Sequence, residues 1–81
     1  MSLRTALRFL EQGDWEQAHP IVQADDSALG SWAHGIVHLQ EGDVENARYW
    51  LRQAGRAFSS DIAAELSALA QAIRDSEART Q

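Results

Sequence analysis

Two histidines and a glutamate stand at helical spacing in the middle of the chain: His34, His38 and Glu41. Steps of four and three residues place their side chains on one face of a helix. Two imidazoles one turn apart can share a divalent metal ion, and a carboxylate one turn further on would complete a site of two histidines and one carboxylate. His19, on the neighbouring predicted helix, could approach the same point.

The alternative is a half-exposed polar face. His38 and Glu41 then interact at helical spacing, and His34 packs against a neighbour. Neither a cysteine nor an HExxH pattern supports a metal site. We therefore predict no metal ion and no other cofactor, and keep His34, His38, Glu41 and His19 as the ligands if a metal does bind.

Three arginines, Arg48, Arg52 and Arg56, recur at steps of four residues further along the chain. Such a stripe can hold carboxylates or phosphates by bidentate hydrogen bonds, so it is a candidate anion-binding site. The alternative is a solvated helix face with weak pairs such as Glu45 with Arg48.

Signatures of catalysis are absent from the sequence. It has no GxSxG motif, no glycine-rich phosphate loop and no cysteine nucleophile, and paired carboxylates occur only as Asp25 and Asp26 in a predicted linker. We expect that the protein is not an enzyme.

A repeat defines the elements that hold these residues. The stretch "LEQGDWEQA" at 10–18 returns as "LQEGDVENA" at 39–47, with the Gly-Asp step recurring 29 residues later. Gly13 and Gly42 can end a helix with a positive φ, and Asp14 and Asp43 can cap the next one. Each unit is therefore predicted to be a helix, a tight turn and a second helix.

In the first predicted helix of both units, apolar residues recur at steps of three and four and in the same register. Each of these two helices is therefore predicted to have one apolar stripe. We expect this side to bind a partner peptide or helix, or a second copy in a homodimer. The residues are Leu3, Leu7, Leu10, Trp32, Ile36 and Leu39.

The chain is predicted to form one all-α domain, 1–81, with about five helices: a hairpin at 3–24, a second at 28–55 and a C-terminal helix at 60–76. The tail from Glu77 is expected to fray. Pro20 lies inside the second helix and predicts a kink or a late start there. Asp26 or Ser27 is expected to cap the third helix.

The runs "HLQEGDVENARYWLRQA" and "LEQGDWEQA" resemble the core of tetratricopeptide repeats, with small residues at Ala47 and Ala54 and an aromatic at Trp15. The run "GDVENARYWLRQAGR" also resembles a small family of bacterial helical proteins with no established activity. The repeat period is shorter than the usual length of about 34 residues. The resemblance implies tetratricopeptide-like hairpins, a scaffolding role and a capping C-terminal helix.

The charge of the chain limits the classes of partner that it is expected to bind. The formal net charge is −5, with 12 acidic against 7 basic residues, which argues against binding to nucleic acid. Charges interrupt the apolar residues near the N-terminus, so neither a membrane span nor a signal peptide is expected, and the absence of cysteine fits the cytoplasm.

The leading hypothesis is a small protein-interaction module without catalysis. The alternatives are a structural homodimer and a histidine-based binder of a metal or small ligand.

Overall fold

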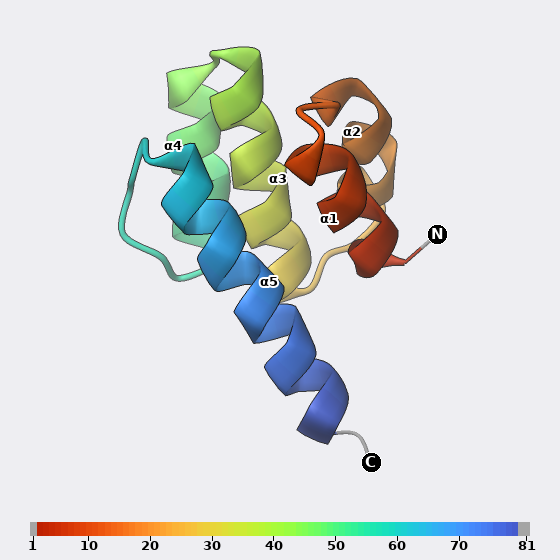
Figure 1. The fold of residues 1–81 in the computed structure, drawn as a ribbon. Coiled ribbons are helices and arrows are strands. Elements are labelled where there is room, and N and C mark those ends of the chain that lie inside the picture. Colours follow the sequence, from red (N-terminus) through yellow and green to blue (C-terminus); the bar gives the residue numbers. More distant parts are fainter. Residues whose placement is uncertain (1, 80–81) are drawn as a thin grey trace.

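Five α-helices make up the computed structural model, which describes residues 2–79 (Figure 1). No strand occurs within that range. The prediction of an all-α fold with five helices is confirmed. In chain order the helices are α1 (Leu3–Glu11), α2 (Trp15–Gln23), α3 (Ala28–Glu41), α4 (Val44–Gln53) and α5 (Ile62–Arg79).

Both Gly-Asp steps form the turns that the repeat predicts. Gly13 and Gly42 have φ angles of 75° and 90°, which a residue with a Cβ adopts only with strain. The side chains of Asp14 and Asp43 then accept a hydrogen bond from the backbone N–H three residues on, at 3.3 Å in both turns. Each step ends one helix and starts the next, so both hairpins turn in the same way.

Helix α2 begins directly after Asp14 and runs through Pro20, so the predicted late start is wrong. Proline has no N–H to donate to the Glu16 carbonyl four residues earlier. The helix persists because Ala18 and Val22 are buried in the core and fix it by packing. Ser27 caps α3 by accepting from the Gly30 N–H at 3.0 Å, one of the two predicted caps.

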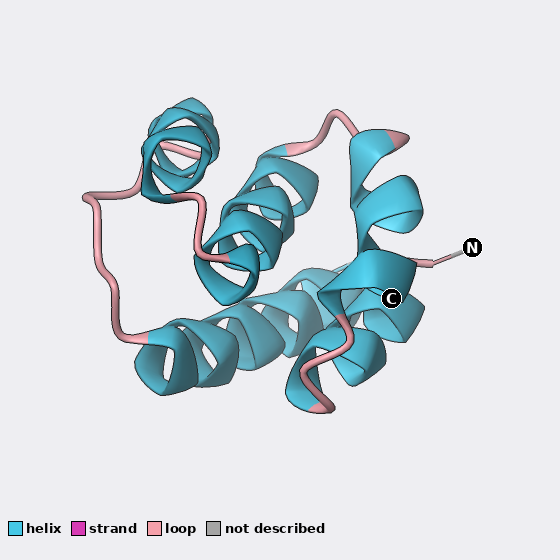
Figure 2. Cartoon of the chain, turned by 90° about the horizontal axis from the view of Figure 1, so that it is seen from above, coloured by secondary structure: helices cyan, strands magenta, loops and turns pink. Residues whose placement is uncertain are grey.

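Helix α3 is the centre of the molecule and contacts each of the other four helices. α1 packs on α2, and α3 on α4, while α5 lies against α1 and α3. Figure 2, seen from above, shows α5 running along one side of the other helices. α3 and α4 approach closely at Gly35, where an added Cβ would lie 2.8 Å from the Leu51 side chain.

A buried polar cluster fastens α5 to α3. The Glu65 carboxylate, on a residue that is 5% exposed, accepts a hydrogen bond from Trp32 Nε1 at 3.0 Å and two from Arg56, each 3.1 Å long. The Arg56 guanidinium also lies 3.7 Å from the centre of the Trp32 ring. We call these three residues the Trp32–Arg56–Glu65 cluster.

The C-terminal helix differs from its predicted bounds of 60–76, since it begins at Ile62 and runs to Arg79. Arg4 donates hydrogen bonds to Glu77, which ties the last turns of α5 to α1. The prediction that the chain frays from Glu77 is therefore wrong for residues 77–79, which are helical. Residues 80 and 81 of the predicted tail lie outside the described residues. No helix among residues 2–79 is both long and apolar enough to cross a membrane.

The predicted partner-binding stripe lies in the core. Five of its six residues are buried in the single chain, and Leu3 packs against them at the edge. The cause is α5, which lies against both α1 and α3. We correct the expectation accordingly: Leu3, Leu7, Leu10, Trp32, Ile36 and Leu39 stabilise the fold rather than form an exposed surface.

Candidate functional site

Three histidines from two helices meet on the side of α3 that faces α2 and α4. His34 and His38 lie one turn apart on α3, and the packing of α2 on α3 brings His19 to them. His34 and His38 are 4% and 8% exposed, whereas His19 is half-buried. We call His19, His34 and His38 the histidine cluster.

The rings of the cluster are in mutual contact. Their centroids lie 5.0 Å apart for His19 and His34, 5.4 Å for His19 and His38, and 5.0 Å for His34 and His38. The Nε2 atoms of His19 and His34 are 3.2 Å apart, so one donates and the other accepts. One ring nitrogen of each histidine lies within 4.8 Å of those of the other two.

Glu41 holds His38 from outside the cluster. Its Oε1 lies 2.7 Å from His38 Nδ1. An ionised carboxylate only accepts, so Nδ1 carries the hydrogen; in the neutral imidazole Nε2 is then the nitrogen with the free lone pair. A carboxylate behind a histidine is the usual outer partner of a metal-ligating imidazole, because it fixes both the tautomer and the ring orientation.

Stacking fixes the orientation of His34. Its ring lies almost parallel to that of Trp50 on α4, with centroids 3.9 Å apart and an interplanar angle of 10°. His38 stacks on the same imidazole at an interplanar angle of 23°. Tyr49 meets the Trp50 ring edge-on. His34 is therefore part of an aromatic stack that joins α3 to α4.

The environment keeps His34 neutral. Its pKa is lowered to about 4, mainly because burial disfavours the charged imidazolium, and also because His38 and His19 lie beside it. At neutral pH His34 therefore carries no charge. Neutral imidazole is the form that binds a metal ion.

A second set of donors adjoins the cluster. Oxygens of Glu41 and Asp43 lie within 4.8 Å of each other and of a His38 ring nitrogen. Asp43 is held by Asn46, whose side chain donates to Oδ2 at 2.7 Å and whose backbone N–H donates to Oδ1 at 3.3 Å. These two bonds lower the pKa of Asp43, so it remains a carboxylate near His38.

The structure thus places all four predicted metal candidates together but changes their roles. His19, which the sequence treated as the outlier, is a full member, and Glu41 bonds to His38 rather than facing the point where the three imidazoles meet. Trp50 and Asp43 were missed as parts of the site. Asp43 caps α4 and Trp50 lies on it, and the packing of α4 on α3 brings both to the histidines, so no spacing along the chain signalled their part in the site.

The predicted arginine stripe does not form a single site. Arg56 belongs to the Trp32–Arg56–Glu65 cluster, and the Arg48 guanidinium lies 4.1 Å from the centre of the Phe58 ring. Arg52 is exposed on α4. The three side chains therefore have different surroundings, and the structure does not present them as one row to a common anion.

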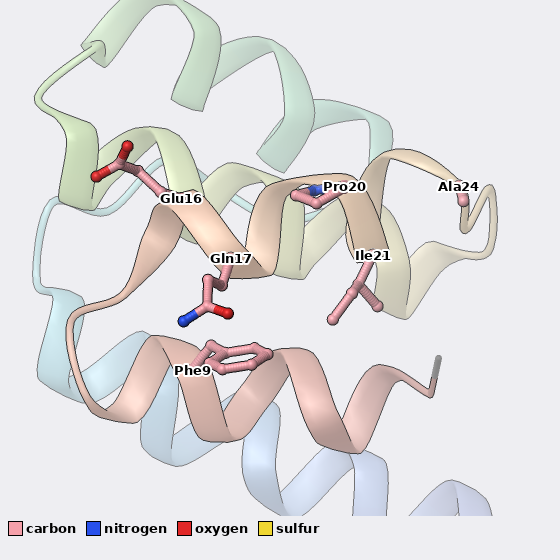
Figure 3. A pocket seen from close by; sticks show the side chains of 6 residues that line it. All are labelled: Phe9, Glu16, Gln17, Pro20, Ile21 and Ala24. Atoms are coloured by element: carbon pink, nitrogen blue, oxygen red, sulfur yellow. The ribbon is translucent and has the colours of Figure 1, made fainter.

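A shallow groove separates α1 from α2 on another part of the surface (Figure 3). Its volume is about 540 Å³. Figure 3 shows Phe9 of α1 and Ile21 of α2 facing each other across it. The lining residues, mostly apolar, are Phe9, Glu16, Gln17, Pro20, Ile21 and Ala24.

Comparison of the chain with family models, with curated proteins and with solved structures found no match. The resemblance to tetratricopeptide repeats therefore stays a prediction from the sequence.

Proposed function

We propose that this protein binds one divalent transition-metal ion through His19, His34 and His38, with Zn²⁺ as the ion that suits the donors best. The convergence of three imidazole nitrogens from two helices within 4.8 Å carries the proposal. Imidazole is a preferred ligand of Zn²⁺ and of neighbouring first-row metals.

The spacing of the nitrogens fits an ion. With Zn–N bonds of about 2.0–2.1 Å at tetrahedral angles, two ligand nitrogens lie about 3.3 Å apart. The Nε2 atoms of His19 and His34 already have this separation, at 3.2 Å. The third nitrogen lies within 4.8 Å of those of the other two histidines, so each of its two distances must shorten by at most about 1.5 Å.

The protonation states fit as well. His34 is neutral at neutral pH because its pKa is lowered to about 4. Glu41 accepts from His38 Nδ1, which leaves Nε2 of that ring for the ion. An ion would replace the hydrogen shared by His19 and His34 while keeping the three rings close to their places.

Titration of the protein with Zn²⁺ tests the proposal, with any affinity tag removed because polyhistidine binds the same ions. Binding of one ion per chain with micromolar affinity or tighter is expected, measured by calorimetry and by tryptophan fluorescence, to which Trp50 contributes from its stack on His34. His19→Ala should abolish this binding, whereas Arg52→Ala, an exposed change on α4, should not. Binding no tighter than millimolar in the unmodified protein would refute the proposal.

The groove between α1 and α2 favours a second candidate function, protein binding, on a surface other than the one the sequence predicted. Phe9 and Ile21 can hold an apolar side chain of an extended peptide, and the Glu16 carbonyl receives no hydrogen bond from Pro20. Peptides selected on the protein from a display library should share an apolar anchor. Their binding should fall with Ile21→Asp and persist with Val44→Asp; selection of no peptides, or indifference to Ile21→Asp, would remove this candidate.

A further inference from the structure

We infer that the metal ion bound by the histidine cluster keeps its fourth coordination position open to solution, where it exchanges water for a small monoanion. The inference rests on the proposed function. Structural zinc sites are closed by four protein ligands, whereas sites that act on or sense a ligand combine three protein ligands with one exchangeable position.

The donor inventory supports an open position. Within residues 2–79, the group that contains all three histidines includes no fourth ligating side chain. Trp50 covers the face of His34, but an indole N–H only donates and cannot bind a cation. Two carboxylates, those of Glu41 and Asp43, adjoin His38.

Both carboxylates already have structural roles. Glu41 holds His38 Nδ1 at 2.7 Å, so turning towards the ion would release the ring that it orients. Asp43 caps α4 by accepting from the backbone N–H and the side chain of Asn46, so turning towards the ion would leave the helix without its N-cap. Neither residue can become the fourth ligand without loss elsewhere in the site.

The cluster is also accessible. His19 is half-buried rather than buried, so the cluster reaches the surface at this residue. Three neutral imidazoles leave the full charge of a divalent ion uncompensated among its direct ligands. That charge favours an anion such as azide or a carboxylate at the exchangeable position, with water there in its absence.

Cobalt substitution tests the inference. Co²⁺ takes the place of Zn²⁺, and its visible absorption reports the number and type of its ligands. The tag-free protein is loaded with one equivalent of Co²⁺ and titrated with sodium azide, and the protein-bound cobalt is measured after dialysis at each step. The expected result is a saturable shift of the visible bands while cobalt stays bound.

The outcomes separate the two proposals. Failure to bind Co²⁺ and Zn²⁺ overturns the proposed function, and the open position with it. A cobalt spectrum that azide leaves unchanged, with the ion retained, overturns the open position alone.

Asp43→Asn is the matched variant, because Asn caps a helix as well as Asp. Its cobalt spectrum without azide should equal that of the unmodified protein. A changed spectrum would show that Asp43 is the fourth ligand, and would also overturn the inference.

Discussion

Helix α3 carries a buried polar cluster on each of two sides, and the two clusters differ in how their hydrogen bonds are satisfied. Towards α5, the Glu65 carboxylate accepts three hydrogen bonds, from Trp32 and Arg56, and the charges of the pair cancel. Towards α2 and α4, three imidazoles face one another. A donor–acceptor network that is complete within the protein stabilises the fold, whereas lone pairs that converge on one point suit a cation.

The difference extends to the surroundings of each cluster. Arg56 lies over the Trp32 ring, so the first cluster is also closed by an aromatic face. In the histidine cluster the stacked Trp50 orients His34 without using its nitrogens. The first arrangement leaves nothing for a ligand to bind, and the second prepares ligand atoms and holds them in place.

Loss of a metal ligand should affect metal binding most. His34→Gln removes an imidazole at the centre of the cluster, so Zn²⁺ affinity should fall by more than about 100-fold, beyond the range expected for an outer partner. Calorimetric titration measures the change, and circular dichroism checks that the helices persist. An unchanged affinity in the folded variant would contradict the assignment of His34 as a ligand.

Breaking the other cluster should change stability instead. Glu65→Ala leaves the Trp32 N–H and the Arg56 guanidinium without their acceptor, and the free energy of unfolding should fall by about 2–3 kcal/mol. Urea denaturation measures the fall, and Zn²⁺ affinity in the folded variant should stay within about twofold of the original. A large loss of affinity would show that the two sides of α3 do not act separately.

Acid should weaken the fold through His34. Its pKa is about 4 in the folded chain and near 6.5 when unfolded, so the unfolded chain binds the proton first as pH falls. The resulting loss of stability begins near pH 6.5, is complete near pH 4 and amounts to at most about 3 kcal/mol. Urea denaturation between these pH values measures it in the metal-free protein. His34→Gln should flatten the profile over this window, and an equally steep profile in that variant would exclude His34 as the cause.

Loss of the outer partner should weaken metal binding less than loss of a ligand does. Glu41→Gln replaces the carboxylate behind His38 by a weaker acceptor, so metal affinity should fall about 10-fold or somewhat more. Asp43→Asn retains the helix cap and should have little effect. Titrations of the two variants side by side make the comparison, and a result in the reverse order would move the role of outer partner from Glu41 to Asp43.

Local features of this chain followed from its sequence. The Gly-Asp turns depend on the positive φ of Gly13 and Gly42 and on the Asp side chain that follows each, which accepts from the backbone N–H three residues on. The sequence predicted the glycine conformations and the Asp caps. Helical spacing likewise placed His34 and His38 on one face of α3. Interactions within about one helical turn need no knowledge of the tertiary structure.

Features that depend on packing between helices were predicted poorly. The apolar stripe showed that Trp32 and its partners would avoid water, whereas a covering C-terminal helix was implied only by the resemblance to tetratricopeptide repeats. The contact of Trp50 with His34 depends on the close approach of α4 to α3 at Gly35, which no spacing within one helix reveals. Whether His34 and His38 form a polar face or part of a metal site likewise depended on where α2 places His19.

The most direct test of the central claim is the nitrogen-15 NMR spectrum of the imidazole rings with and without one equivalent of Zn²⁺. The chain has three histidines, so every imidazole signal of the tag-free protein belongs to the cluster. We expect one ring nitrogen of each histidine to shift to a metal-bound position, with Nε2 as this nitrogen in His38, and all three changes to saturate together at one ion per chain. Unchanged rings, or a response of His19 alone, would contradict this expectation.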